Sequence, residues 1–473
     1  MKRFYLLLAA AALLAAGCQK EPAAEKGELT KAFIEFNLNF TGEEMTKAED
    51  YEPDTDPDTD GVQAPDTEVG SDAEHNVETA VFYFFQDGDF VKSIPVSKGN
   101  ITSALSDGDH VKKTTVPTEL KTGTYDVYAT INYEVKDIAT EADFKKIQNT
   151  FAPVTAVPSD GLPMSSRDKE GVMSCKVTIT TENTSDNPAK VSLYMERMNA
   201  KISMKHSETY TVGTLATVKL TGYKVVNLTT KTNLFRQVGT VEADGTISNL
   251  SFGPITETTQ IVDPETELKV ANNDNIPAKI TLDNKVNLTD SNYSGMPTGT
   301  GMNTLIYCNE NGMAPANQLN TYATAIAFKA SITPANNNYF DANGAAVTYS
   351  TGDDLWYFGG KFYDSLNALN EVNDFSLTDT NYSDFGVKKF VGGVCYYTYY
   401  IKHYDNFKPL ELGFMEYAIV RNNDYQVTIT NIKDLGEDVP TVKPDPIEME
   451  ESYFQATLFV RPWTVRAQDA VLG

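Results

Sequence analysis

Two stretches of strictly alternating apolar and polar residues lie near the two ends of the chain. The first, AFIEFNLNF at 32–40, has its apolar positions at Ile34, Phe36, Leu38 and Phe40. The second, YFQATLFVRPW at 453–463, has its apolar positions at Phe454, Ala456, Leu458 and Val460. A period of two residues is typical of a β-strand with one buried face. The pattern therefore predicts one such strand at each end, and each strand needs a groove to cover its apolar face.

Both terminal strands are separated from the rest of the chain by acidic segments that contain proline. TGEEMTKAEDYEPDTDPDTDGVQAPDTEVGSDAE follows the first strand, and LGEDVPTVKPDPIEMEE at 435–451 precedes the second. Such segments have too few apolar residues to form a core. We therefore expect linkers beside both strands. The C-terminal strand reads as detached from the main body, whereas for the first strand a normal first strand of the sandwich followed by a surface loop is the alternative that composition alone favours.

Between these segments the pattern predicts many short strands with turns between them. TAVFYFF at 79–85 runs into a Gln86-Asp87-Gly88 turn and a second strand, which is a hairpin signal. One helix is expected over 140–151, with Thr140 as its N-cap. The strand pattern begins again after about residue 190, which favours an all-β fold of two β-sandwich domains over alternating βαβ units.

Composition and charge limit the classes of function that this chain can have. The chain has 473 residues, of which 41% are hydrophobic, so it can bury two sizeable cores. Its 65 acidic residues against 39 Lys and Arg give a formal charge of −26. A surface of this sign repels phosphate backbones, so no nucleic-acid partner is expected.

The N-terminus reads as an export signal. MKRFYLLLAAAALLAAGC has a basic start and an apolar stretch too short for a stable membrane span, and it ends on Gly17-Cys18. This ending resembles a bacterial lipobox, which implies cleavage before Cys18 and acylation of its thiol. Ala15 stands where many lipoboxes have Leu, and an ordinary signal peptide is the alternative. Lipid on Cys18 would be the only membrane anchor.

No motif for catalysis or cofactor binding is found, so we predict no enzyme, no catalytic residue and no cofactor. Cys175, Cys308 and Cys395 are too far apart for a zinc motif or a disulfide framework and read as core residues. Asp56, Asp58 and Asp60 match the start of a calcium loop, but Thr67 stands where such a loop needs a bidentate Glu. We therefore predict no metal site.

Several stretches together resemble the fimbrillins, the shaft subunits of type V pili, and most closely their Mfa-type branch of minor fimbrium subunits. The stretches are VFYFFQDGD, GTYDVYATIN, LPMSS at 162–166, YMERMNAKISM, GKFY at 360–363, RNNDYQVTITNIKDLG at 421–436, and the closing LFVRPWTV. They extend over essentially the full length of the chain.

The resemblance implies two transthyretin-like β-sandwiches in a lipoprotein precursor. In such precursors a protease removes the N-terminal strand, and a neighbour's C-terminal strand fills the vacated groove. Here the cut would fall between Lys47 and Ala48, although many members of the family are cut after Arg. The strand removed would be Phe33 to Phe40, with Ile34, Phe36, Leu38 and Phe40 on its apolar face, and the donor strand would run from Tyr453 to Trp463.

The expected organisation follows from these assignments. Residues 1–17 form the signal peptide, 18–47 the propeptide with its strand, 48–190 the N-terminal sandwich, 191–436 the C-terminal sandwich, and 437–473 the linker and donor strand. Cutting after Lys47 removes six bases and six acids, so the charge stays at −26.

The expected partners are further copies of the chain, fimbrial anchor and tip subunits, and the maturation protease. The expected location is the outer membrane, held by lipid before cleavage, and then the extracellular fimbrium. Two alternatives stay open. One is an anchor or tip subunit, although the pattern indicates no extra binding domain. The other is a surface glycan-binding lipoprotein that keeps its lipid.

Overall fold

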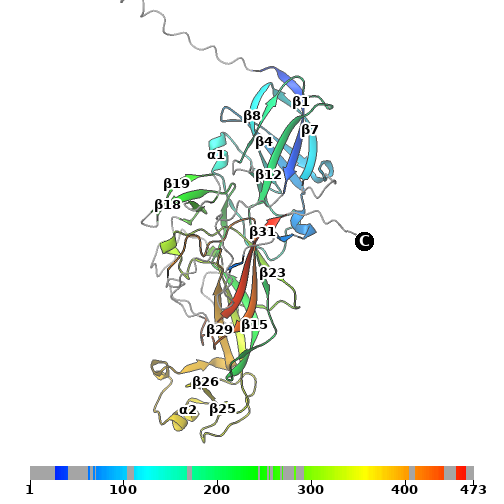
Figure 1. Cartoon of the computed structure of the whole chain (residues 1–473). Coiled ribbons are helices and arrows are strands. Elements are labelled where there is room, and N and C mark those ends of the chain that lie inside the picture. Colours follow the sequence, from blue (N-terminus) through cyan, green and yellow to red (C-terminus); the bar gives the residue numbers. More distant parts are fainter. Residues whose placement is uncertain are drawn as a thin grey trace, which may run out of the picture.

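The computed structural model describes residues 27–40, 62–63, 68–69, 71–103, 111–167, 173–242, 246–252, 255, 259–266, 269, 282–283, 292–403, 411–440 and 454–464. These residues are almost entirely β-strands and connections, as predicted. Figure 1 shows them as two sandwiches one above the other, with a smaller unit at the end remote from the first sandwich.

The N-terminal sandwich is built from a nine-stranded sheet that folds over on itself. Across the sheet its strands are β5 (Asp89–Ser97), β4 (Thr79–Gln86), β8 (Gly123–Ile131), β10 (Met164–Arg167), β12 (Ala189–Arg197), β1 (Leu29–Asn39), β7 (Val111–Lys121) and β6 (Thr102–Ser103), with β11 (Cys175–Ile179) beside β8. The predicted hairpin is present as β4 and β5, with Asp87 and Gly88 in the left-handed region at its turn.

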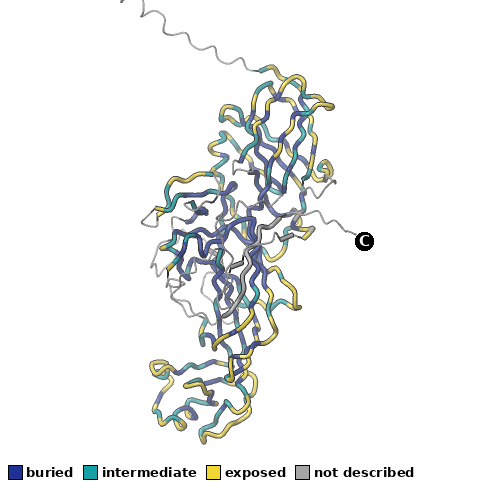
Figure 2. Tube along the Cα trace, in the orientation of Figure 1, coloured by how far each residue is buried: buried dark blue, intermediate teal, exposed yellow. Residues whose placement is uncertain are grey.

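The C-terminal sandwich consists of two sheets around one large core. One sheet contains β2 (Val62–Gln63), β31 (Phe454–Thr464), β30 (Asn423–Ile432), β13 (Ala200–Lys205) and β23 (Asn303–Cys308), with β3 (Glu68–Val69) also beside β31. The other contains β14 (Tyr210–Val212), β15 (Ala216–Val226), β24 (Ala325–Pro334) and β29 (Val394–Tyr400), with β22 (Ser294–Gly295) beside β15. Figure 2 shows buried residues running through both sandwiches.

The change from one sandwich to the other falls between β12 and β13. Val191, Leu193 and Met195 of β12 pack in the N-terminal core, whereas Ile202 of β13 packs in the C-terminal core. The boundary expected at residue 190 therefore lies inside β12.

The helix expected over 140–151 is wrong in its length. Helix α1 covers only Glu141–Lys145, and Thr140 caps it by accepting a hydrogen bond from the Asp143 backbone N–H. The chain then becomes extended as β9 (Gln148–Thr150), which pairs with β17 (Lys231–Asn233). Tertiary pairing thus replaces the second half of the helix.

A small unit is inserted between β24 and β29, and the sequence did not reveal it. It contains β25 (Tyr339–Phe340), β26 (Leu355–Phe358), β27 (Lys361–Tyr363), β28 (Lys388–Phe390) and helix α2 (Leu366–Asn373). Trp356, Tyr363 and Leu369 are buried in a separate small core. This unit is the lowest part of the molecule in Figure 1.

The remaining short strands form two further small sheets. They are β16 (Leu228–Thr229) with β21 (Leu282–Asp283), and β18 (Val238–Val241) between β19 (Ile247–Ser251) and β20 (Thr259–Ile261).

Candidate functional site: the two terminal strands

The N-terminal strand β1 occupies an interior position of the first sandwich. All eleven of its residues pair with β7 in antiparallel register, from Leu29 opposite Lys121 to Asn39 opposite Val111. On its other edge, positions 34 to 39 pair with β12 in parallel register. The strand therefore has a hydrogen-bonded neighbour on each side, and its removal would leave a gap between β7 and β12.

The predicted alternation of β1 is confirmed by burial. Ile34 and Phe36 are 0% exposed, Leu38 is 1% and Phe40 is 4% exposed, and Ala32 extends the same face. The intervening side chains are half-buried. Burying each large apolar side chain stabilises the fold by roughly 1.5–3 kcal/mol, so this face contributes several kcal/mol to the stability of the first sandwich.

Phe36 lies at the centre of this face. Its ring stacks on Phe82 of β4 with 3.6 Å between centroids, and it meets Phe84 edge-on at 6.2 Å. Because β4 belongs to the opposite part of the folded sheet, Phe36 joins the two layers of the sandwich. If β1 is removed, Phe82 stays in the sandwich but loses the Phe36 ring that covers it.

Further hydrogen bonds hold β1 in place. The Phe33 N–H donates to the Asn183 carbonyl at 2.9 Å, and the Thr122 N–H donates to the Glu28 carbonyl at 2.8 Å. The Asn39 side-chain amide donates to the Leu193 carbonyl at 3.2 Å. These contacts set the register of β1 in its groove.

The C-terminal strand β31 pairs with β30 of the second sandwich in antiparallel register. The register places Val460 opposite Tyr425, Leu458 opposite Val427, and Ala456 opposite Ile429. Phe454 stands opposite Ile432. The predicted donor strand thus forms as a strand and has a partner within its own chain.

The other edge of β31 is covered by two short strands from the acidic segment. Val62 and Gln63 of β2 pair in parallel with Leu458 and Phe459. Glu68 and Val69 of β3 pair in parallel with Trp463 and Thr464. A segment just downstream of the predicted cut therefore lies along the predicted donor strand.

A buried polar cluster, the Glu74 cluster, joins the two sandwiches beside these strands. Glu74 accepts a hydrogen bond from the Tyr307 hydroxyl at 2.6 Å and lies 3.3 Å from the Lys201 ammonium, which also lies 3.1 Å from Asp424. Burial acts to raise the pKa of Glu74, but Lys201, Tyr307 and Arg197 outweigh it and hold the pKa below its ordinary value. The carboxylate therefore stays charged and ties the start of the N-terminal sandwich to the second.

A second buried cluster surrounds Glu196 at the end of β12. Its carboxylate lies 3.4 Å from Arg167, 3.7 Å from Arg236 and 3.8 Å from Arg421. Arg421 also contacts Glu310 at 2.8 Å. Burial alone would raise the pKa of Glu196, yet the three guanidinium groups hold this pKa below its ordinary value. Sequence reasoning missed both clusters, because their members are distant along the chain.

Several predicted positions lie outside the described residues. They are Cys18, Lys47, Ala48, Asp56, Asp58 and Asp60. Of Phe454, Ala456, Leu458, Val460 and Trp463 the structure gives the backbone pairing described above.

In the part of the chain that the structure describes, no group of three or more His, Cys, Asp or Glu residues is placed to hold a metal ion. No helix in that part has the length and apolar character needed to cross a bilayer. Cys308 and Cys395 are buried free thiols, and Cys175 is half-buried.

Residues 388–469 match the family described as major fimbrial subunit protein type IV, fimbrillin, C-terminal. This match covers β28, β29, β30 and β31, so it includes the predicted donor strand and its partner. The resemblance to the fimbrillins is thus confirmed, and the match supports a fimbrial, structural role at the cell surface. No curated protein sequence matches the chain.

The chain is also similar to several solved structures. A candidate cell adhesion protein from Parabacteroides distasonis ATCC 8503 is 14% identical, with a TM-score of 0.45, over 92% of this chain and 100% of that one. A fimbrilin from Porphyromonas gingivalis W83 is 12% identical, with a TM-score of 0.42, over 93% and 99%. The tip fimbrial protein Mfa3 from Porphyromonas gingivalis is 13% identical, with a TM-score of 0.37, over 92% and 100%. These likenesses are too distant to carry function to this chain.

Proposed function

We propose that the chain is the precursor of a polymerising fimbrial subunit that is assembled by exchange of its terminal strands. It is exported as a lipoprotein acylated on Cys18, held at the outer membrane, and released by a cut after Lys47. The C-terminal strand of another copy then replaces β1. The observation that carries this proposal is the interior position of β1, whose apolar face is buried between two neighbouring strands.

Loss of β1 would create a strong acceptor site. The facing edges of β7 and β12 would lose their backbone partners, and buried Phe82 would lose its stacking contact with Phe36. Each replaced ladder hydrogen bond contributes about 0.5–1.5 kcal/mol net, and each buried large apolar side chain roughly 1.5–3 kcal/mol. An incoming strand with the same alternation of apolar and polar residues as β1 would restore both the ladder hydrogen bonds and the buried apolar contacts.

The donor strand must first leave its own chain. In the precursor β31 pairs with β30 and with the short strands β2 and β3. In the exchange, the backbone hydrogen bonds that β31 makes in its own chain are replaced by similar ones to the neighbour. The net driving force is therefore the burial of apolar side chains in the vacated groove. Before the cut, β1 occupies that groove at high effective concentration and prevents assembly.

The test compares three forms of the full chain expressed with its export signal. Wild-type protein recovered from the cell surface should begin at Ala48 and form polymers on a non-reducing gel. Lys47→Ala should remain monomeric and acylated. Deletion of residues 452–473 should give cleaved, folded monomers. Polymers formed by either variant would contradict the proposal, as would surface protein that begins at acylated Cys18.

An accessory subunit is a second candidate, favoured by the inserted unit between β24 and β29. A tip subunit needs an additional surface for binding. The inserted unit has its own small core around Trp356 and Leu369 and could present such a surface. Immunogold labelling separates the two roles, because a shaft subunit labels along the filament and a tip subunit labels one end.

A further inference from the structure

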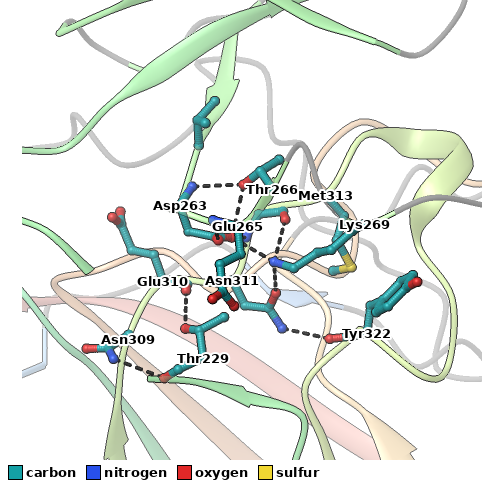
Figure 3. Close-up of polar contacts among 12 residues, drawn as sticks. Thr229, Asp263, Glu265, Thr266, Lys269, Asn309, Glu310, Asn311, Met313 and Tyr322 are labelled. Carbon is teal, nitrogen blue, oxygen red and sulfur yellow. Dashed lines mark hydrogen bonds and ion pairs between the residues drawn. The ribbon is translucent and has the colours of Figure 1, made fainter. Parts of the chain in front are cut away.

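A completely buried lysine follows β20 in the second half of the chain. Lys269 and Asp263 have 0% exposed side chains. The Lys269 ammonium donates to Asp263 Oδ2 at 2.7 Å, to Asn311 Oδ1 at 2.7 Å and to the Gly312 carbonyl at 2.9 Å. Figure 3 shows the three side chains converging on one point. An amine, a carboxamide and a carboxylate are thus held together without water access.

The carboxamide of Asn311 is held in one orientation. Its Nδ2 donates to the Tyr322 carbonyl at 2.8 Å, to Thr324 Oγ1 at 3.0 Å and to the Asn227 carbonyl at 3.2 Å. Because the nitrogen faces these acceptors, the carbonyl group faces Lys269. The amine nitrogen of Lys269 therefore lies beside the carbonyl of the amide.

Asp263 is oriented just as firmly. Its Oδ1 accepts from the Glu265 N–H at 2.8 Å, and its Oδ2 accepts from the Gly312 N–H at 2.6 Å and from the Thr266 hydroxyl at 3.0 Å. Gly312 permits this approach, since a Cβ there would lie 2.6 Å from the Ile261 carbonyl oxygen. The carboxylate is within hydrogen-bond distance of the lysine nitrogen, as a general base requires.

The geometry points to a covalent modification: an intramolecular isopeptide bond between Lys269 Nζ and Asn311 Cγ, formed with Asp263 as the proton carrier. A positioned amine and an amide held together in a dry interior need no further reactant, and such proximity replaces the entropic cost of a bimolecular encounter. Asp263 accepts a proton from the ammonium, and the free amine attacks the amide carbon. The bond would tie the 261–269 segment to the connection between β23 and β24.

The reaction balances without an oxidant or cofactor. The Nζ–Cγ bond forms and the Cγ–Nδ2 bond breaks. Of the three ammonium protons of Lys269 one stays on the new amide nitrogen, and two pass through Asp263 to Nδ2. These two protons and the two already on Nδ2 leave as one ammonium ion, and Asp263 ends in its starting charge state.

The decisive experiment is a complete tryptic peptide map of the wild-type full-length chain under denaturing conditions. A lysine in an isopeptide bond is not cleaved, so peptides 237–279 and 286–329 should appear joined, lighter than their sum by one ammonia. Recovery of peptides 237–269 and 286–329 with unmodified masses would overturn the inference. So would loss of one water within 237–279 alone, because that product joins Lys269 to Asp263.

Two variants test the part assigned to Asp263. Asp263→Asn keeps the shape of the side chain and should abolish the joined peptide. Glu265→Gln changes a neighbouring carboxylate, which pairs with Lys231 at 2.9 Å, and should retain it. A joined peptide in Asp263→Asn would contradict its role. Circular dichroism establishes whether each variant folds. If Asp263→Asn does not fold, the peptide map of the wild-type chain by itself tests whether the isopeptide bond forms. This inference is independent of the proposed assembly, because a monomer can carry the bond.

Discussion

Phe36 stabilises the precursor through a strand that the proposed mature subunit lacks. The ring is fully buried and stacks on Phe82 across the sandwich. Phe36→Ala should therefore lower the free energy of unfolding of the precursor's first sandwich by about 3–5 kcal/mol through the cavity that it leaves. Urea denaturation monitored by fluorescence measures this loss.

Asn37→Ala is the matched control for that substitution. Asn37 is the next residue of the same strand, and its side chain is half-buried on the opposite face. The change should cost no more than about 0.5 kcal/mol. Equal effects of the two substitutions would mean that the alternating face does not anchor β1.

Glu196 should make the stability of the junction between the sandwiches decrease at acidic pH. Burial acts to raise the folded-state pKa of Glu196, but Arg236, Arg421 and Arg167 hold it below its ordinary value. A group with a depressed pKa stabilises the fold above its unfolded pKa, and this stabilisation is lost as pH falls through the folded pKa. Glu196→Gln should therefore have a lower Tm than wild type at neutral pH.

The difference in Tm between wild type and Glu196→Gln should shrink as the pH falls through the lowered folded-state pKa of Glu196. Scanning calorimetry between about pH 7 and about pH 3 measures it. A difference that stays constant over this range would show that Glu196 is not charged in the fold.

At the residue scale, the sequence predicts what depends on neighbours along the chain. The faces of β1 follow from alternation alone, and Cys308 and Cys395 are buried as their apolar surroundings indicate. The buried charges do not follow in this way. Glu196 and Arg421 meet only because β12 and the start of β30 converge, and single-sequence patterns carry no record of such pairing.

Among the elements, β31 is the one that must leave its own chain in the proposed assembly. Val427 and Leu458 stand directly opposite in an antiparallel pair, where Cα atoms lie about 4.5–5.5 Å apart, a distance that suits a disulfide. Val427→Cys combined with Leu458→Cys should lock β31 onto its own chain under oxidising conditions. Cleaved protein should then remain monomeric, and a reducing agent should restore polymer formation.

The single variants Val427→Cys and Leu458→Cys serve as controls and should polymerise with or without reductant. Native gels read the outcome. If the oxidised double variant polymerises as wild type does, β31 does not need to leave β30, and the donor assignment is wrong.

Element boundaries show where tertiary structure overrides local preference. The start of α1 can be predicted from Thr140 and Asp143, which form its N-cap. Its end cannot be predicted from the local sequence, because Gln148–Thr150 pair with β17 as a strand. The inserted unit escaped prediction because its strands have only two to four residues. Such short runs are too brief to display a period.

At the scale of the whole molecule, charge should govern how fast subunits meet. Removal of residues 1–47 leaves the formal charge at −26, so two mature subunits repel each other. Salt screens this repulsion, with a Debye length of about 10 Å at about 0.1 M ionic strength. We expect the initial rate of polymerisation to rise several-fold between about 0.01 M and about 0.15 M salt.

Light scattering after the cut measures this rate. Sucrose at matched viscosity, added in place of salt, controls for changes in diffusion. A rate that falls with salt would instead indicate local attraction between oppositely charged surfaces of the two subunits.

The two sides of the β1 groove differ in a way that restricts what can enter. A replacement strand must run antiparallel to β7 and parallel to β12 at once, as β1 does. A strand inserted backwards would invert both ladders and misplace its apolar positions. Every joint in a filament would then have the same polarity, so its two ends are chemically different, and a subunit without a tail could cap only one of them.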